Sequence, residues 1–104
     1  MRILAIGAHP DDIEIACAGT LIKCRQRGDS VIVCHLSQGN LGHMEIPPQE
    51  LIPIREAEAK RAGAIAGIEV ISGGMKDLEI YDNNKASRDI VVDIIRYADP
   101  DVII

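Results

Sequence analysis

Apolar residues recur along this chain with two different spacings, and each change of spacing marks the border of a predicted element. Near-continuous apolar runs, typical of strands buried on both faces of a parallel sheet, cover residues 3–8, 31–36, 69–72 and 101–104. Apolar residues at helical spacing occupy the stretches between them, residues 12–27, 54–66 and 85–98. Strands and helices therefore alternate, which predicts an α/β fold with a parallel sheet and right-handed crossovers.

Glycine and proline residues mark the expected starts and ends of the predicted helices. Gly28 and Gly67 follow the first and second predicted helices, where glycine readily adopts the left-handed conformation that ends a helix. Pro53 is expected at the first position of the second helix, because an N–H at that position has no partner within the helix. Ser37 to Pro53 would then form a long loop, and such loops at the carboxyl end of a strand are often functional.

The strongest chemical signal lies where the first strand ends, at His9-Pro10-Asp11-Asp12. If the strands are ordered three-two-one-four, this point borders the crevice where open α/β sheets bind ligands. An imidazole and a carboxylate are common zinc ligands, and their spacing lets His9 and Asp12 turn toward one ion. Asp11 would then lie beside the metal and accept a proton from water. Aspartate at this position can equally cap the helix, so a structural role stays open.

The stretch Ala8-His9-Pro10-Asp11-Asp12-Ile13-Glu14, with Gly19-Thr20-Leu21, resembles the signature of the LmbE-like (PIG-L) zinc-dependent N-deacetylases. The similarity continues through residues 37–42, Arg55 with Glu58, and residues 99–103. Those enzymes remove acyl groups, usually acetyl, from amino sugars and their conjugates. The resemblance implies a Rossmann-like three-layer fold and a small-molecule substrate of the N-acetylglucosamine type. It further implies that His9 and Asp12 bind zinc and that Asp11 is the general base.

Three further positions gain meaning from the resemblance. By spacing alone, Arg55 and Glu58 form a surface ion pair on the second helix. The family's arginine faces the active site, which implies that Arg55 contacts a sugar hydroxyl or the developing oxyanion. The family often has an acid after the first loop glycine, but this chain has Asn40. Asp77 aligns loosely with a family acid near the sugar, although its turn-rich surroundings favour a solvated carboxylate.

The remaining histidines and cysteines favour structural roles. His35 lies inside the second strand and is expected to be a hydrogen-bonded core histidine. His43 lies in the long loop, where a solvated side chain is a better expectation than a metal ligand. Cys17, Cys24 and Cys34 form no CxxC motif and are odd in number, so we expect small buried apolar side chains and no disulfide framework.

Composition narrows the class of protein. A chain of 104 residues with 47% hydrophobic residues suits one folded domain, and two Tyr without Phe or Trp imply an aliphatic core. The net charge of −5 and the lack of aromatic platforms argue against a nucleic-acid partner. No run approaches the length of a membrane span, and the first strand follows Met1 directly, so we expect a cytoplasmic protein.

The predicted fourth strand stops at Ile104. The resembled enzymes continue into a loop with a histidine as third zinc ligand, and a catalytic zinc usually has three protein ligands. We therefore interpret residues 1–104 as the amino-terminal part of a single LmbE-like deacetylase domain, truncated after its fourth strand. The apolar edge of that strand favours pairing with another chain, which predicts a homo-oligomer.

Other functions compete with metal-assisted amide hydrolysis. A signalling receiver module also places an acid pair after strand one, but it needs a phosphoacceptor aspartate after strand three, where Ile71-Ser72-Gly73 stands. A nucleotide-binding module needs a glycine-rich cradle, whereas here two carboxylates would repel a pyrophosphate. A non-catalytic fragment or interaction module also stays open.

Overall fold

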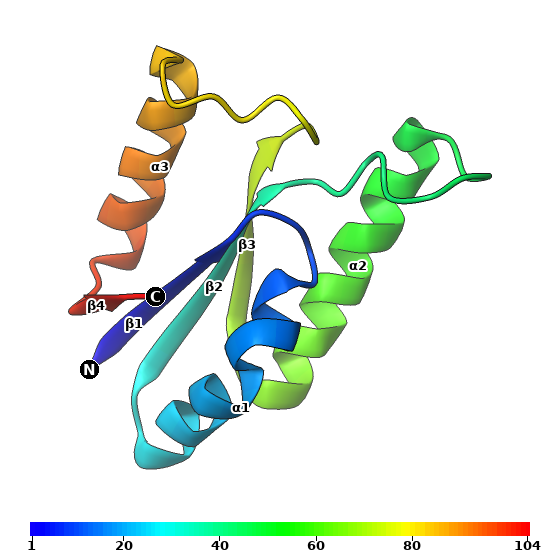
Figure 1. Ribbon diagram of the computed structural model, residues 1–104. Helices are drawn as coiled ribbons and strands as arrows, with labels where there is room; N and C mark the ends of the chain where they lie inside the picture. Colours follow the sequence, from blue (N-terminus) through cyan, green and yellow to red (C-terminus); the bar gives the residue numbers. More distant parts are fainter.

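The computed structural model describes all residues, 1–104, and shows a parallel sheet between two layers of helices (Figure 1). Strands and helices alternate along the chain in the order β1 (Arg2–Gly7), α1 (Asp12–Arg27), β2 (Ser30–Ser37), α2 (Pro48–Ala66), β3 (Glu69–Met75), α3 (Lys85–Ala98) and β4 (Val102–Ile103). The predicted α/β class is confirmed. No helix is both long enough and apolar enough to cross a membrane.

The sheet has the strand order β3-β2-β1-β4, and every pairing is parallel. This is the order that places a crevice at the carboxyl end of β1, between β1 and β4. The loops that follow β1, β2 and β3 leave the sheet at the same end (Figure 1). Side chains from these three loops can therefore meet there, although they lie far apart in the sequence.

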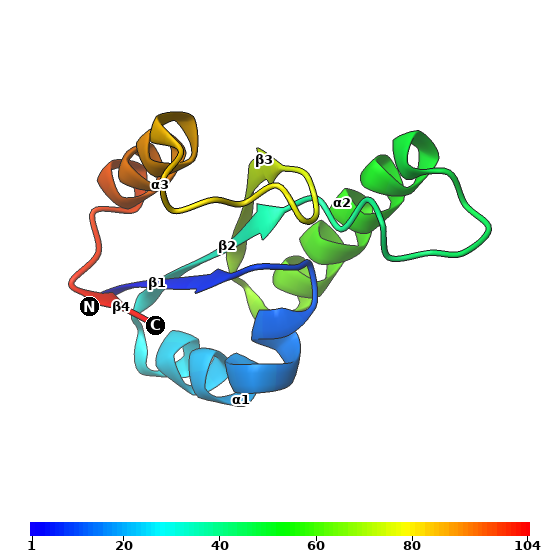
Figure 2. The same ribbon diagram turned by 45° about the horizontal axis from the view of Figure 1, so that its top comes forward.

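The two faces of the sheet bury alternate residues of each strand. One face carries the cluster under α1 and α2, formed by Ile3, Ala5, Ile13, Leu21, Val31 and Val33. The other face, under α3, carries Leu4, Cys34, Ile94 and Ala98. Figure 2 shows the sheet between these two layers. The core is aliphatic, as the sequence predicts. Cys34 is buried in it, as predicted, whereas Cys17 and Cys24 are only partly buried and pack against its edge.

Helix α2 begins earlier than the sequence pattern indicates. It starts at Pro48, so Pro53 lies inside the helix rather than at its first position. Pro48 itself takes the position that suits proline, while the backbone N–H groups of Glu50 and Leu51 both donate to the carbonyl of Pro47. Pro53 forfeits one hydrogen bond early in a long helix, which the rest of α2 tolerates. The loop after β2 is correspondingly shorter than expected.

Strand β3 is longer than predicted and runs through Gly73 and Gly74 to Met75. A Cβ at Gly73 would lie 2.8 Å from the carbonyl oxygen of Leu36 in β2, so only glycine allows the two strands this close. The β2–β3 register shifts at this same point, between His35 and Ser37. This irregularity carries the chain after β3 back toward the loop after β2.

Candidate active site

A tight turn at the end of β1 brings together the three side chains that the sequence singled out, those of His9, Asp11 and Asp12. The carbonyl of His9 accepts hydrogen bonds from the backbone N–H groups of Asp11 and Asp12, at 2.8 and 3.2 Å. A Cβ at Gly7 would lie 3.1 Å from the Cβ of Asp12, so the glycine lets α1 begin directly beside the strand end. The turn therefore places an imidazole and two carboxylates at the carboxyl edge of the sheet.

His9 and Asp12 face one another, as expected of two ligands to one ion. Asp12 Oδ2 accepts the backbone N–H of His9 at 2.8 Å and lies 3.7 Å from His9 Nδ1. Both side chains are about half exposed, at 51% for His9 and 44% for Asp12, so their donor atoms are open to solvent. The same backbone contact holds the carboxylate against the turn and leaves Asp12 Oδ1 without a hydrogen-bond partner in the protein.

The donor pair fits a zinc ion. Zinc binds nitrogen and oxygen at about 2.0–2.2 Å, so two such bonds span up to about 4.2 Å between their donor atoms. The distance of 3.7 Å between His9 Nδ1 and Asp12 Oδ2 falls within that limit. No group of three His, Cys, Asp or Glu side chains converges anywhere in residues 1–104. His9 and Asp12 could therefore provide two of the three protein ligands that a catalytic zinc normally has.

Asp11 does not cap α1. It occupies the N-cap position, but its side chain makes no capping hydrogen bond. Its carboxylate is 55% exposed and lies 3.7 Å from Nη2 of Arg55, whose Nη2 also donates to the carbonyl of Pro10 at 3.5 Å. Arg55 reaches across from α2 to contact this turn, and its Nη1 donates to Glu58 at 3.2 Å. The structure thus contains the predicted Arg55–Glu58 pair and also brings Arg55 to the acids.

Asp77 is the residue that sequence reasoning misjudged most. It follows β3, and its side chain is only 7% exposed, so the expectation of a solvated carboxylate is wrong. Its Oδ1 accepts the backbone N–H of Gly39 at 3.1 Å, and its Oδ2 accepts that of Leu41 at 2.9 Å. Burial raises the pKa of Asp77, but the hydrogen bonds from Leu41 and Gly39, the nearby hydroxyl of Ser37 and the charge of His9 outweigh it and hold the pKa below its usual value.

Asn40 completes the contact between the two loops. Its side-chain oxygen accepts the backbone N–H of Asp77 at 2.8 Å, and the residue is buried. An acid at this position would place a second negative charge beside the buried carboxylate of Asp77, whereas the amide adds none. The departure from the acid that often follows this glycine therefore suits the local electrostatics.

The other two histidines are not brought to the turn as ligands. His35 is buried on the α1 side of β2, as predicted, but its Nε2 has no hydrogen bond and lies 3.6 Å from Glu14. Burial lowers the pKa of His35, although the Glu14 carboxylate opposes the shift. His43 Nδ1 accepts the backbone N–H groups of Glu45 and Ile46 and shapes its own loop.

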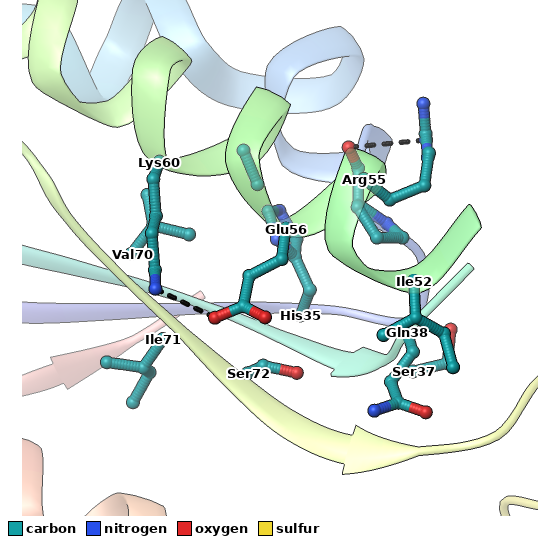
Figure 3. Close-up of a pocket in the computed structure, with 12 residues that line it drawn as sticks. His35, Ser37, Gln38, Ile52, Arg55, Glu56, Lys60, Val70, Ile71 and Ser72 are labelled. Carbon is teal, nitrogen blue, oxygen red and sulfur yellow. Dashed lines mark hydrogen bonds and ion pairs between the residues drawn. The ribbon is translucent and has the colours of Figure 1, made fainter. Parts of the chain in front are cut away.

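A pocket lies beside this turn rather than over it. It measures about 340 Å³ and opens between α2, the carboxyl end of β2 and the first half of β3 (Figure 3). Arg55 and Pro10 line it, and they are its link to the acids; His9, Asp11 and Asp12 do not line it. Glu56 and Lys60, which pair at 2.7 Å, line it as well, and so does His35 (Figure 3).

Comparison with known proteins identifies the family. Residues 4–104 match the family described as "PIG-L: GlcNAc-PI de-N-acetylase". The chain belongs to the PIG-L (LmbE-like) family, which the fold and the turn at His9 both support. It is 37% identical over 73 residues to the probable N-acetyl-alpha-D-glucosaminyl L-malate deacetylase 2 of Bacillus anthracis, covering 65% of this chain and 32% of that protein.

Solved structures show the same fold. The N,N'-diacetylchitobiose deacetylase of Pyrococcus horikoshii superposes with a TM-score of 0.88 at 27% identity, over 97% of this chain and 39% of that one. GalB, the 4-carboxy-2-hydroxymuconate hydratase of Pseudomonas putida KT2440, gives 0.85 at 22% identity, over 99% and 46%. The chain thus spans 32–46% of the length of these three relatives. Because a hydratase has the same fold, the fold alone does not define the reaction, which has to be inferred from the residues of the site.

Proposed function

We propose that this chain forms the amino-terminal part of a zinc-dependent N-deacetylase domain. Its substrate would be an N-acetylglucosamine-type amino sugar or a conjugate of one, because the Bacillus anthracis and Pyrococcus horikoshii relatives are named for substrates of that type. The observation that carries the proposal is the convergence of Asp11 and Arg55 beside the His9–Asp12 donor pair. That set contains a base, a cation and two metal ligands, which is what metal-assisted amide hydrolysis needs.

His9 and Asp12 would hold the zinc ion, and a third ligand would come from sequence beyond residue 104. When bound, the ion supplies Lewis acidity to the acyl carbonyl and makes water more acidic. Asp11 takes the proton of the attacking water and then delivers it to the leaving amine, so that one carboxylate serves as base and acid in turn. Its exposure and its lack of a capping bond leave both oxygens available for this.

Arg55 would stabilise negative charge at the reacting centre. Its guanidinium is held by Glu58 and by the carbonyl of Pro10, so it is already directed toward the turn before substrate binds. A donor fixed in this way stabilises an oxyanion without reorganisation during the reaction. The same group can donate to a sugar hydroxyl, and the kinetics of Arg55 variants separate the two roles.

The receiver alternative is contradicted by the topology. Receivers have the flavodoxin-like strand order 2-1-3-4-5, with the third strand next to the first. Here β3 pairs with β2 and forms the edge of the sheet, while β4 lies beside β1. The end of β3 is therefore separated from the end of β1 by β2, unlike the receiver arrangement, in which the two strands are adjacent.

Metal content and hydrolysis, measured together on the intact protein, test the proposal. Purified protein should contain zinc and release acetate from an N-acetylglucosamine conjugate. Asp11→Asn should keep the zinc and lose about 10²–10⁴-fold in kcat, the usual contribution of a general base. Asp82→Asn, which changes an exposed loop carboxylate, is the matched control. Full turnover by Asp11→Asn would reject this role, and protein that binds zinc but hydrolyses no N-acetyl sugar would favour another reaction on the same fold.

A further inference from the structure

The two ring nitrogens of His9 face two carboxylates of different character. Nδ1 lies 3.7 Å from Oδ2 of Asp12, and Nε2 lies 3.9 Å from Oδ1 of Asp77. Asp12 is half exposed, at 44%, whereas Asp77 is 7% exposed. One side of the imidazole is therefore open to a solvent-borne ion, and the other side is backed by a buried charge.

The carboxylate of Asp77 is fixed in place by the loop after β2. Each oxygen accepts one backbone N–H, from Gly39 and from Leu41, and the backbone of Asp77 is held by Asn40. A carboxylate has about four acceptor sites, so Oδ1 can still accept one more donor. The closest ring donor to that oxygen is Nε2 of His9.

We propose that Asp77 is a positioning residue that accepts the Nε2–H of His9 and so turns Nδ1 toward Asp12 and the metal. The inference rests on the proposed zinc site, and it assigns a role to a residue outside the first turn. Metal-binding histidines commonly donate their second N–H to a carboxylate, which fixes the tautomer and the orientation of the ring. Here that carboxylate comes from the chain after β3, so metal binding and the contact between the two loops become coupled.

The distance of 3.9 Å is longer than a hydrogen bond, and the two partners differ in how easily they can close it. His9 is 51% exposed, so its ring is free to rotate by the ångström that is needed. Asp77 is anchored at both oxygens and cannot follow. A metal bound between Nδ1 and Asp12 would favour the tautomer with a proton on Nε2, which is the form that Asp77 can hold.

The tautomer of His9 can be determined in the wild-type protein. This measurement needs no variant, so misfolding of a variant cannot affect it. Nitrogen-15 NMR of the zinc-loaded intact protein should show His9 protonated at Nε2 and coordinated through Nδ1. Coordination through Nε2 would overturn the inference and leave the proposed zinc site intact. Protein that binds no zinc at all would overturn both.

A second experiment separates orientation of His9 from simple loop packing. Asp77→Asn removes the charge and one acceptor, so zinc affinity should fall about 10–100-fold, as for other carboxylates behind metal ligands. Asn40→Ala breaks the same loop contact at the backbone of Asp77 and keeps the carboxylate. Its zinc affinity should change by less than about 3-fold, since this variant keeps the carboxylate that orients the ring.

Thermal unfolding of Asp77→Asn and Asn40→Ala measures how much stability each variant loses when the contact between the two loops is weakened. Equal losses of zinc affinity in Asp77→Asn and Asn40→Ala would show that the loop contact alone matters, and would overturn the inference. A loss confined to Asp77→Asn, together with a changed His9 nitrogen-15 spectrum, supports it.

Discussion

Arg55 on α2 lies with its Nη2 3.7 Å from Oδ2 of Asp11 at the start of α1, and this pair joins two helices across the candidate site. The contact is too long for a hydrogen bond and both groups are partly exposed, at 28% and 55%, so it contributes little stability. The contact instead places the guanidinium of Arg55 beside the carboxylate of Asp11, which has no other ionic partner.

Replacing Arg55 should therefore impair turnover far more than folding. We expect Arg55→Ala in the intact protein to lower kcat about 10²-fold if the guanidinium stabilises the oxyanion, while the melting temperature stays close to that of the wild type. Arg61→Ala removes an exposed arginine from the same helix that makes no contact with the turn, so it is the matched control. An increase in KM with unchanged kcat would instead assign Arg55 to ground-state binding of the sugar.

Loss of His9 should remove the metal. His9→Gln takes away the ring nitrogen that faces Asp12, so zinc content should fall from about one ion per chain to a trace, and hydrolysis should be lost with it. His43→Gln changes a loop histidine whose Nδ1 accepts two backbone N–H groups, and it should keep its zinc. Metal analysis after dialysis gives the comparison. Wild-type zinc content in His9→Gln would exclude His9 as a ligand.

Two helical glycines should respond to alanine with opposite signs. A Cβ at Gly63 in α2 would overlap a methyl of Val70 and lie 2.7 Å from the carbonyl of Ile68, so Gly63→Ala should destabilise by about 1–3 kcal/mol. Gly19 in α1 has open space around it, so Gly19→Ala should stabilise by about 0.5–1 kcal/mol through helix propensity. Urea titrations of the two variants measure both. A Gly63→Ala protein as stable as the wild type would mean that α2 can shift away from β3.

Local sequence pattern predicted the parts of the fold that depend on neighbouring residues. The bounds of α1 and α3 match the predicted ranges, because residue types mark their ends: Gly28 follows α1, and Asp99-Pro100 follows α3. The start of α2 was misplaced because Pro48 and Pro53 both satisfy the rule for a first helical residue. Only the tertiary position of the helix decides between them.

The same limit applies to the candidate site. His9, Asp11 and Asp12 could be recognised from one short stretch, since a single turn brings them together. The burial of Asp77 could not, because its partners are backbone N–H groups of Gly39 and Leu41 on another loop. Because every residue except proline has a backbone N–H, residue types do not show which of these groups will donate to Asp77. The one available signal was Asn40, the amide that stands where an acid was expected.

The buried His35 should make the fold sensitive to mild acid. Burial lowers its folded-state pKa below the unfolded value of about 6.5, so the unfolded chain binds more protons as the pH falls below that value. Above the unfolded pKa this histidine has no effect on stability. Below it, the free energy of unfolding should decrease with falling pH, by at most about 1.4 kcal/mol per pH unit from this one group.

Unfolding by urea at several pH values between about 7.5 and 5.5 measures this slope, a window that spans the unfolded pKa. His35→Gln should flatten it, because glutamine does not titrate, whereas His43→Gln should retain the wild-type slope. The Glu14 carboxylate, 3.6 Å from His35 Nε2, favours the protonated ring and opposes the effect of burial. Glu14→Gln should therefore steepen the slope. Equal slopes in wild type and His35→Gln would show that another group governs stability in this range.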